Sequence, residues 1–250
     1  MKYFMSIRQS INNFRAKFYN LVTKHIFVKY CGLIVIIGYI SLLIIGVIIA
    51  ALLDPDGYTI WGNWISDLGG INHTPAPFLY DIACIVAGSM TLPFTFYMEN
   101  LLAPLPKKNE LSRHHYSRLR FRLSSSAFLF SLIGNLGYIG VGIFSADRDY
   151  DFLSVMGQGP HGLMSFLAFG GFTLGAFFMG WLIVLYDTKI PKILGIYGIC
   201  GPFVFSIINL IESTPLLEWL LLFSILIWII PLFLIVLQKP ELVPKESANS

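Results

Sequence analysis

CGLIVIIGYISLLIIGVIIAALL, at residues 31–53, is the stretch of sequence that decides the fold. It contains no charged residue, and it exceeds the about 20 apolar residues that a helix needs to cross a bilayer. Further segments of similar length and composition follow at 78–98, 123–146, 163–186, 193–211 and 216–237. The sequence therefore predicts an all-α, polytopic membrane protein built as a bundle of six transmembrane helices.

The composition of the 250-residue chain supports this class and excludes others. Hydrophobic residues make up 56% and charged residues 12%, against about 45–50% and 25% in soluble domains. The 21 Phe and 12 Tyr residues exclude intrinsic disorder, which requires low hydrophobicity and high net charge. The apolar runs are continuous, whereas the strands of a membrane β-barrel would alternate apolar and polar residues.

The distribution of charge predicts the topology. Among the 17 Lys and Arg residues, only Arg148 falls in a segment assigned to the extracytoplasmic side, and basic residues are retained on the cytoplasmic side. Both termini are therefore expected in the cytoplasm. We divide the chain into a basic amphipathic cytoplasmic segment (1–30), a six-span membrane domain (31–238) and a flexible cytoplasmic tail (239–250), and we expect residence in the plasma membrane.

The segment before the first span has apolar residues at alternating steps of three and four, the period of one helix face. These residues are Phe4, Ile7, Ile11, Phe14, Phe18 and Leu21. Two interpretations are open. Basic residues lie between the apolar ones, so the segment is either a helix on the anionic cytoplasmic leaflet or only a basic flank that fixes topology.

Membrane lipids are the expected partners, and nothing in the charge pattern indicates nucleic acid. A cytoplasmic loop carries a cluster of basic residues that either contacts anionic lipid headgroups or only fixes topology. The cluster consists of Lys107, Lys108, Arg113, Arg118, Arg120 and Arg122. The sequence does not indicate an oligomeric state.

Small and polar residues inside the spans predict how the helices pack. Glycines are frequent in the third, fourth and fifth spans, with Gly171 and Gly175 at GxxxG spacing, so these helices are expected to form the tightest part of the bundle. Ser131, Asn135 and Tyr138 share one face of the third span as a polar stripe. The stripe predicts either hydrogen bonds between helices or the lining of a polar cavity.

The first extracytoplasmic loop, at 54–77, reads DPDGYTIWGNWISDLGGINHTPAP. It combines turn-forming Gly, Pro and Asp residues with aromatic residues suited to the headgroup region. Long ordered loops are often functional, so we expect this loop to be structured against the helix ends and to carry function.

The string at 63–69, NWISDLG, resembles the ISDxG loop motif of an uncharacterised six-span membrane protein family related to the Frag/DRAM/Sfk group. The six-span layout with cytoplasmic ends matches that family over almost the whole chain. The resemblance implies a role in lipid biology, and it carries over Ser66, Asp67 and Gly69. The chain departs from the Frag-type pattern at Leu68 and in the longer stretch before Pro75.

Polar and ionisable residues near the extracytoplasmic ends of the spans are the candidate site residues. The catalytic candidates are Asp67, Asp81, His161 and Glu212, and the candidate ligand-binding residues are Ser66, Asp67, Gly69, Asp81 and His161. No HExxH, HxxxH, GxSxG or Cys-His pattern is present, so no metal and no cofactor are expected. An acid within a span normally has a function, which favours Asp81.

Three functions remain open from the sequence. The leading hypothesis is a lipid-interacting protein that recognises or organises a headgroup through its ISDLG loop. The first alternative is a lipid hydrolase or transferase with a carboxylate and histidine site at the outer membrane edge. The second is a carrier of small solutes or ions that uses the polar stripe and Asp81.

Overall fold

The computed structural model describes residues 2–102, 118–146 and 159–238; in the first helix, side chains are described for Gln9 and from Asn12 onward. Every regular element in these ranges is helical, and six helices are long and apolar enough to cross a membrane. The predicted all-α bundle of six transmembrane helices is therefore confirmed.

The first span, His25–Leu53, is a continuous helix in three parts: α2 (His25–Ile34), a single π-helical turn η1 (Val35–Tyr39) and α3 (Ile40–Leu53). It begins at His25 rather than at the expected Cys31, because Lys24 has an extended backbone that separates it from the preceding helix. The remaining spans are α4 (Phe78–Leu102), α5 (Arg118–Ile143), α6 (Pro160–Leu185), α7 (Lys192–Ile211) and α8 (Pro215–Gln238).

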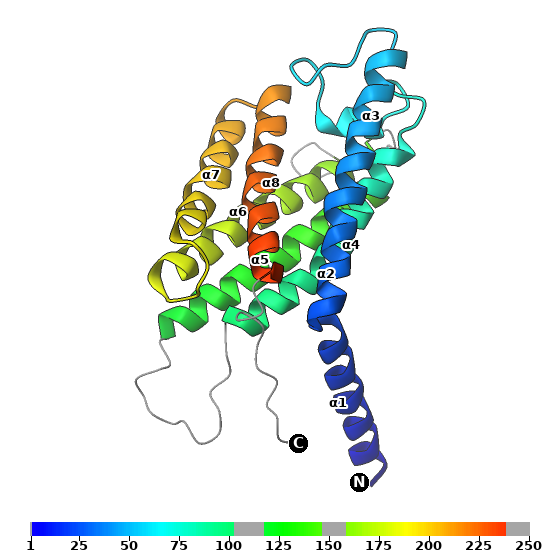
Figure 1. Ribbon diagram of the computed structural model, residues 1–250. Coiled ribbons are helices and arrows are strands. Elements are labelled where there is room, and N and C mark those ends of the chain that lie inside the picture. Colours follow the sequence, from blue (N-terminus) through cyan, green and yellow to red (C-terminus); the bar gives the residue numbers. More distant parts are fainter. Residues whose placement is uncertain (1, 103–117, 147–158, 239–250) are drawn as a thin grey trace.

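The segment before the first span forms the helix α1 (Lys2–Val22). Phe14, Phe18 and Leu21 on its apolar face are exposed. The Tyr19 hydroxyl donates a hydrogen bond of 3.0 Å to Glu99 at the end of α4, which attaches α1 to the bundle. In Figure 1, α1 continues beyond α2 and away from the other spans, so the structure does not place it across the end of the bundle.

The centre of the bundle is formed by α4, α5 and α6, which pack in sequence order (Figure 1). At the α5–α6 contact the backbones of Gly134 and Gly171 touch, and a Cβ on either residue would overlap the opposite helix. The predicted close packing of the third and fourth spans is therefore seen. The fifth span, α7, approaches α6 this closely only in its first half, where Gly195 meets Gly180.

The polar stripe lies inside this central packing. Asn135 is 0% exposed, and its Nδ2 donates hydrogen bonds of 2.9 Å to Thr95 Oγ1 of α4 and 2.8 Å to the Ser131 carbonyl oxygen. The hydroxyls of Tyr138 and Tyr39 are 2.6 Å apart, which joins α5 to η1. The stripe thus connects helices, and it gives no support to the carrier hypothesis.

Candidate functional site

The ISDLG string forms a short 3-10 helix of its own, η2 (Ile65–Gly69), outside the first span. The backbone N–H of Trp64 donates a hydrogen bond of 2.8 Å to Asp67 Oδ2, so this carboxylate caps the start of η2. The Tyr58 hydroxyl donates a hydrogen bond of 2.9 Å to the Trp64 carbonyl oxygen. Burial, with the Asp67 charge as a smaller cause, raises the pKa of Tyr58 well above its usual value, so the hydroxyl remains a donor.

Hydrogen bonds to two distant helices hold η2 against the outer end of the bundle. The backbone N–H of Ile65 donates a hydrogen bond of 2.9 Å to Glu218 Oε2, and Trp219 Nε1 donates one of 3.2 Å to the Asn63 carbonyl oxygen. Glu218 and Trp219 both lie in the first turns of α8. The hydroxyl of Ser145, just after α5, donates a hydrogen bond of 2.7 Å to the Gly69 carbonyl oxygen. The loop is therefore a fixed cap on the bundle, as its composition predicted.

Gly69 and Asp81 lie where η2 rests on the start of α4. A Cβ on Gly69 would lie 3.0 Å from Tyr80 Cδ1 and 3.3 Å from Asp81 Oδ1. A Cβ here would require the Tyr80 ring or the Asp81 carboxylate to shift by a few tenths of an ångström, so glycine relieves a tight contact at the end of the ISDLG string. Asp81 is therefore next to the loop cap and belongs to its packing.

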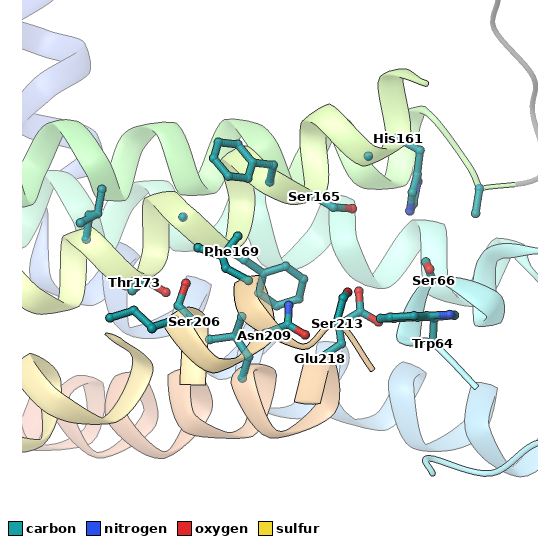
Figure 2. Close-up of a pocket in the computed structure, with 18 of the residues that line it drawn as sticks. Trp64, Ser66, His161, Ser165, Phe169, Thr173, Ser206, Asn209, Ser213 and Glu218 are labelled. Carbon is teal, nitrogen blue, oxygen red and sulfur yellow. The ribbon is translucent and has the colours of Figure 1, made fainter. Parts of the chain in front are cut away.

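A cavity of about 720 Å³ opens beneath this cap, between the outer halves of α6 and α7 and the start of α8. Figure 2 shows that the polar side chains around it come from all three helices and from the loop and point toward a shared space. The polar and aromatic residues at its wall include Trp64, Ser66, His161, Ser165, Thr173, Ser206, Asn209, Ser213 and Glu218.

His161 is held in one orientation at the outer end of α6. Its Nδ1 lies 2.6 Å from the Phe144 carbonyl oxygen, and because a carbonyl only accepts, Nδ1 must carry the proton. In the neutral ring, Nε2 is then a hydrogen-bond acceptor, and it has no partner among the described residues. His161 therefore lines the cavity and has an unpaired proton acceptor that is itself shielded from solvent.

Two more cavity residues have unused polar atoms. Thr173 is 3% exposed, and neither its hydroxyl nor Asn209 Oδ1 has a hydrogen-bond partner in the part of the chain that the structure describes. Leaving a buried polar atom unpaired costs about 1–3 kcal/mol. Among the described residues, Tyr97, Asn135 and Trp228 also have unpaired polar atoms away from the cavity, but the three atoms of His161, Thr173 and Asn209 belong to residues that line one space, where a ligand can complete them.

The rest of the wall is apolar and faces the bilayer. Phe166 of α6 and Leu210 of α7 are 56% and 69% exposed on the outside of the bundle, and both also line the cavity. With a rise of about 1.5 Å per residue, α6 advances about 18 Å from His161 to Thr173, more than half of a hydrocarbon core of about 30 Å. The cavity thus joins a polar mouth to an apolar side of the bundle.

The structure divides the predicted site residues into two groups and leaves one outside. Ser66 and His161 line the cavity, whereas Asp67, Gly69 and Asp81 belong to the loop cap and do not line it. Glu212 is exposed at the end of α7 and is not among the lining residues. The four catalytic candidates therefore do not converge on one cavity.

Several lining residues were not among the predicted site residues. Glu218, Ser165 and Thr173 are examples, together with Ser206, Asn209 and Ser213. A signal for one of them is present in the sequence: Ser165 follows His161 by four residues, which places both on one face of a helix.

The described part of the basic cluster, Arg118, Arg120 and Arg122, lies at the opposite end of the bundle, at the start of α5. Arg120 Nε donates a hydrogen bond of 3.1 Å to the Leu102 carbonyl oxygen, and its guanidinium lies 5.5 Å from the centre of the Tyr186 ring. The Arg120 side chain therefore makes its contacts within the protein. Arg118 and Arg122 are exposed, and the predicted contacts of Lys107, Lys108 and Arg113 lie outside the described residues.

Across the described ranges, no group of three His, Cys, Asp or Glu side chains is arranged to hold a metal ion.

No protein-family model, curated protein or solved structure matches the chain. The resemblance to the ISDxG family therefore stays a prediction, and the cavity is the feature that indicates a function.

Proposed function

We propose that this multi-pass membrane protein binds a lipid of the outer leaflet in the cavity between α6 and α7. The headgroup lies at the mouth, next to Ser66 of the ISDLG loop, and a hydrocarbon chain lies along the apolar wall. Residence in the plasma membrane is part of the same proposal.

The observation that carries the proposal is the polarity of the cavity from one end to the other. Its mouth has His161 and Glu218, and its side is formed by residues such as Phe166 and Leu210 that also face the bilayer. A lipid has the same sequence of a polar group followed by an apolar chain. Binding sites are usually apolar cavities with a few well-placed polar groups, and this cavity fits that description.

Gly170 offers a way to test the proposal. It lines the cavity, and a Cβ at this position would have no heavy atom within 4 Å. Gly170→Phe should therefore fill the cavity without disturbing the packed helices. Gly46 of α3 also has nothing within 4 Å and does not line the cavity, so Gly46→Phe is the matched control.

The experiment compares lipids that co-purify with the wild type and both variants, by native mass spectrometry from mild detergent. We expect a bound lipid in the wild type and in Gly46→Phe, and its occupancy should fall at least about tenfold in Gly170→Phe. Equal occupancy in all three proteins would rule out lipid binding in this cavity.

A lipid hydrolase or transferase is a second candidate, favoured by the free acceptor Nε2 of His161 at the cavity wall. In that role Nε2 would take a proton from an attacking water or hydroxyl. Incubating the protein with the lipid that co-purifies should then yield a product that His161→Gln does not form. If the wild type leaves that lipid unchanged, the catalytic role is excluded.

A further inference from the structure

The polar atoms left unpaired around the cavity indicate which headgroup it takes. This inference rests on the proposed function, and it concerns the chemistry of the ligand rather than its presence. The atoms that decide it are His161 Nε2, Asn209 Oδ1 and the Glu218 carboxylate.

All three groups accept hydrogen bonds. His161 Nε2 must accept, because Nδ1 donates to the Phe144 carbonyl oxygen. Asn209 Oδ1 is a carbonyl oxygen with no partner among the described residues. The Glu218 carboxylate accepts one hydrogen bond, from the Ile65 N–H, and two carboxylate oxygens have room for more. A ligand that completes this wall must therefore supply hydrogen-bond donors.

The charge around the cavity argues against a phosphate. The described lining contains Glu218 and no Lys or Arg. In the sequence, the segments on this side of the membrane carry seven Asp and Glu residues but only Arg148 as a base. A phosphate or carboxylate headgroup would meet a carboxylate here without the basic partner that buried anions normally have.

Hydroxyl side chains make up most of the remaining polar wall. Ser66 and Ser165 lie near the mouth, and Thr173 lies deeper along α6 with its hydroxyl unpaired among described residues. A hydroxyl both donates and accepts, so these residues match a ligand whose own polar groups are hydroxyls.

We infer that the cavity takes an uncharged, hydroxyl-bearing lipid headgroup such as a single sugar on a diacylglycerol. Its hydroxyls donate to His161 Nε2, to Asn209 Oδ1 and to Glu218, and they exchange hydrogen bonds with Ser66 and Ser165. The loop cap over the mouth covers the headgroup.

The test offers the full-length protein a choice of lipids in phosphatidylcholine nanodiscs. The nanodiscs contain equal amounts of monogalactosyldiacylglycerol, phosphatidylglycerol and phosphatidylethanolamine, and native mass spectrometry measures what each protein retains. We expect the wild type to retain the galactolipid at least about tenfold over either phospholipid, since each additional hydrogen bond contributes about 1 kcal/mol.

Two substitutions at one position examine the acceptor directly. Asn209→Leu replaces the acceptor with an apolar side chain of similar size and should lower galactolipid retention about fivefold. Asn209→Asp keeps an acceptor oxygen and should preserve retention, while a loss of fold would affect both variants. Equal galactolipid retention by Asn209→Leu and the wild type would overturn the assigned contact.

Gly170→Phe separates failure of this inference from failure of the proposed function. If the wild type retains a phospholipid, or all three lipids equally, and Gly170→Phe loses them, the cavity binds lipid but the headgroup assignment is wrong. If Gly170→Phe retains lipids as the wild type does, both proposals fail.

Discussion

Two neighbouring glycines of α6 face opposite environments. Gly171 lies against Gly134 of α5, where a Cβ would overlap the backbone, whereas Gly170 faces the cavity with no heavy atom within 4 Å of an added Cβ. The first contact allows two helices to approach closely, as small residues do in membranes. The second position is next to space that no side chain fills.

The polar residues follow the same division. Asn135, at the α4–α5 contact, donates from Nδ2 to Thr95 Oγ1 and to the Ser131 carbonyl oxygen, while its Oδ1, like Asn209 Oδ1 at the cavity, has no partner among the described residues. The hydrogen bond from Asn135 to Thr95 between spans stabilises the bundle, by about 0.6 kcal/mol on average for such bonds. An unpaired oxygen costs free energy, and a ligand in the cavity can pair Asn209 Oδ1, whereas Asn135 Oδ1 is enclosed between packed helices.

The largest effect should come from adding one methyl group on the packed face of α6. Gly171→Ala forces α6 away from α5 and should lower the free energy of unfolding by about 3 kcal/mol, which is the upper end of the usual cost of overpacking a protein core. Gly170→Ala should leave it unchanged or slightly raised, because alanine favours helix. Thermal unfolding in detergent measures both variants, and equal losses would contradict the assignment of the two faces.

Removing the carboxylate that holds the loop should have the next largest effect. Glu218→Ala leaves the Ile65 N–H without its acceptor, which should cost about 2 kcal/mol. Hydrogen exchange at residues 63–69 should then speed up about thirtyfold. Glu212→Ala, at an exposed carboxylate outside the cavity, serves as control. Unchanged exchange in Glu218→Ala would show that this contact does not fix the loop.

The two asparagines should respond differently to the same substitution. Asn135→Leu removes the hydrogen bond from Asn135 to Thr95 between α4 and α5 and should destabilise the protein by about 1 kcal/mol. Asn209→Leu removes an unpaired carbonyl and should change stability by less than about 0.5 kcal/mol in ligand-free protein. Chemical unfolding of delipidated samples distinguishes them, and the opposite order would contradict the contrast between the packed face and the cavity.

The smallest effect is expected for the hydroxyl pair between η1 and α5. Tyr39→Phe breaks the 2.6 Å contact with Tyr138 and should lower stability by about 0.6 kcal/mol. Tyr30→Phe, at a tyrosine that is exposed on the first span, should have no effect. A shift of the melting temperature that is the same for both would remove Tyr39 from the set of stabilising contacts.

The sequence predicts the spans and much of the central packing because those depend on local properties. An apolar run of about 20 residues defines a span wherever it occurs. The glycine spacing around Gly171 and the stripe through Asn135 each lie within one helix, so their shared faces follow from the helical period. The structure adds only which helix each face contacts.

The cavity depends on residues far apart in the chain, which the sequence does not pair. Ile65 and Glu218 are separated by 153 positions, and nothing local indicates that the ISDLG loop rests on α8. Asp67 was a candidate for chemistry, yet its carboxylate caps η2, a local role that the motif alone does not reveal. Asn209 appears in the sequence as a single polar residue near a helix end, and only the adjacent α6 makes it part of a wall.

Photo-crosslinking with a lipid tests the central claim most directly. A diacyl lipid with a diazirine midway along one chain, incorporated into nanodiscs with the full-length protein, should label the cavity faces of α6 and α7, at residues 165–174 and 203–210. Gly170→Phe should remove that labelling while Gly46→Phe retains it. Labelling spread evenly over all six spans, and unchanged in Gly170→Phe, would contradict a lipid site between α6 and α7.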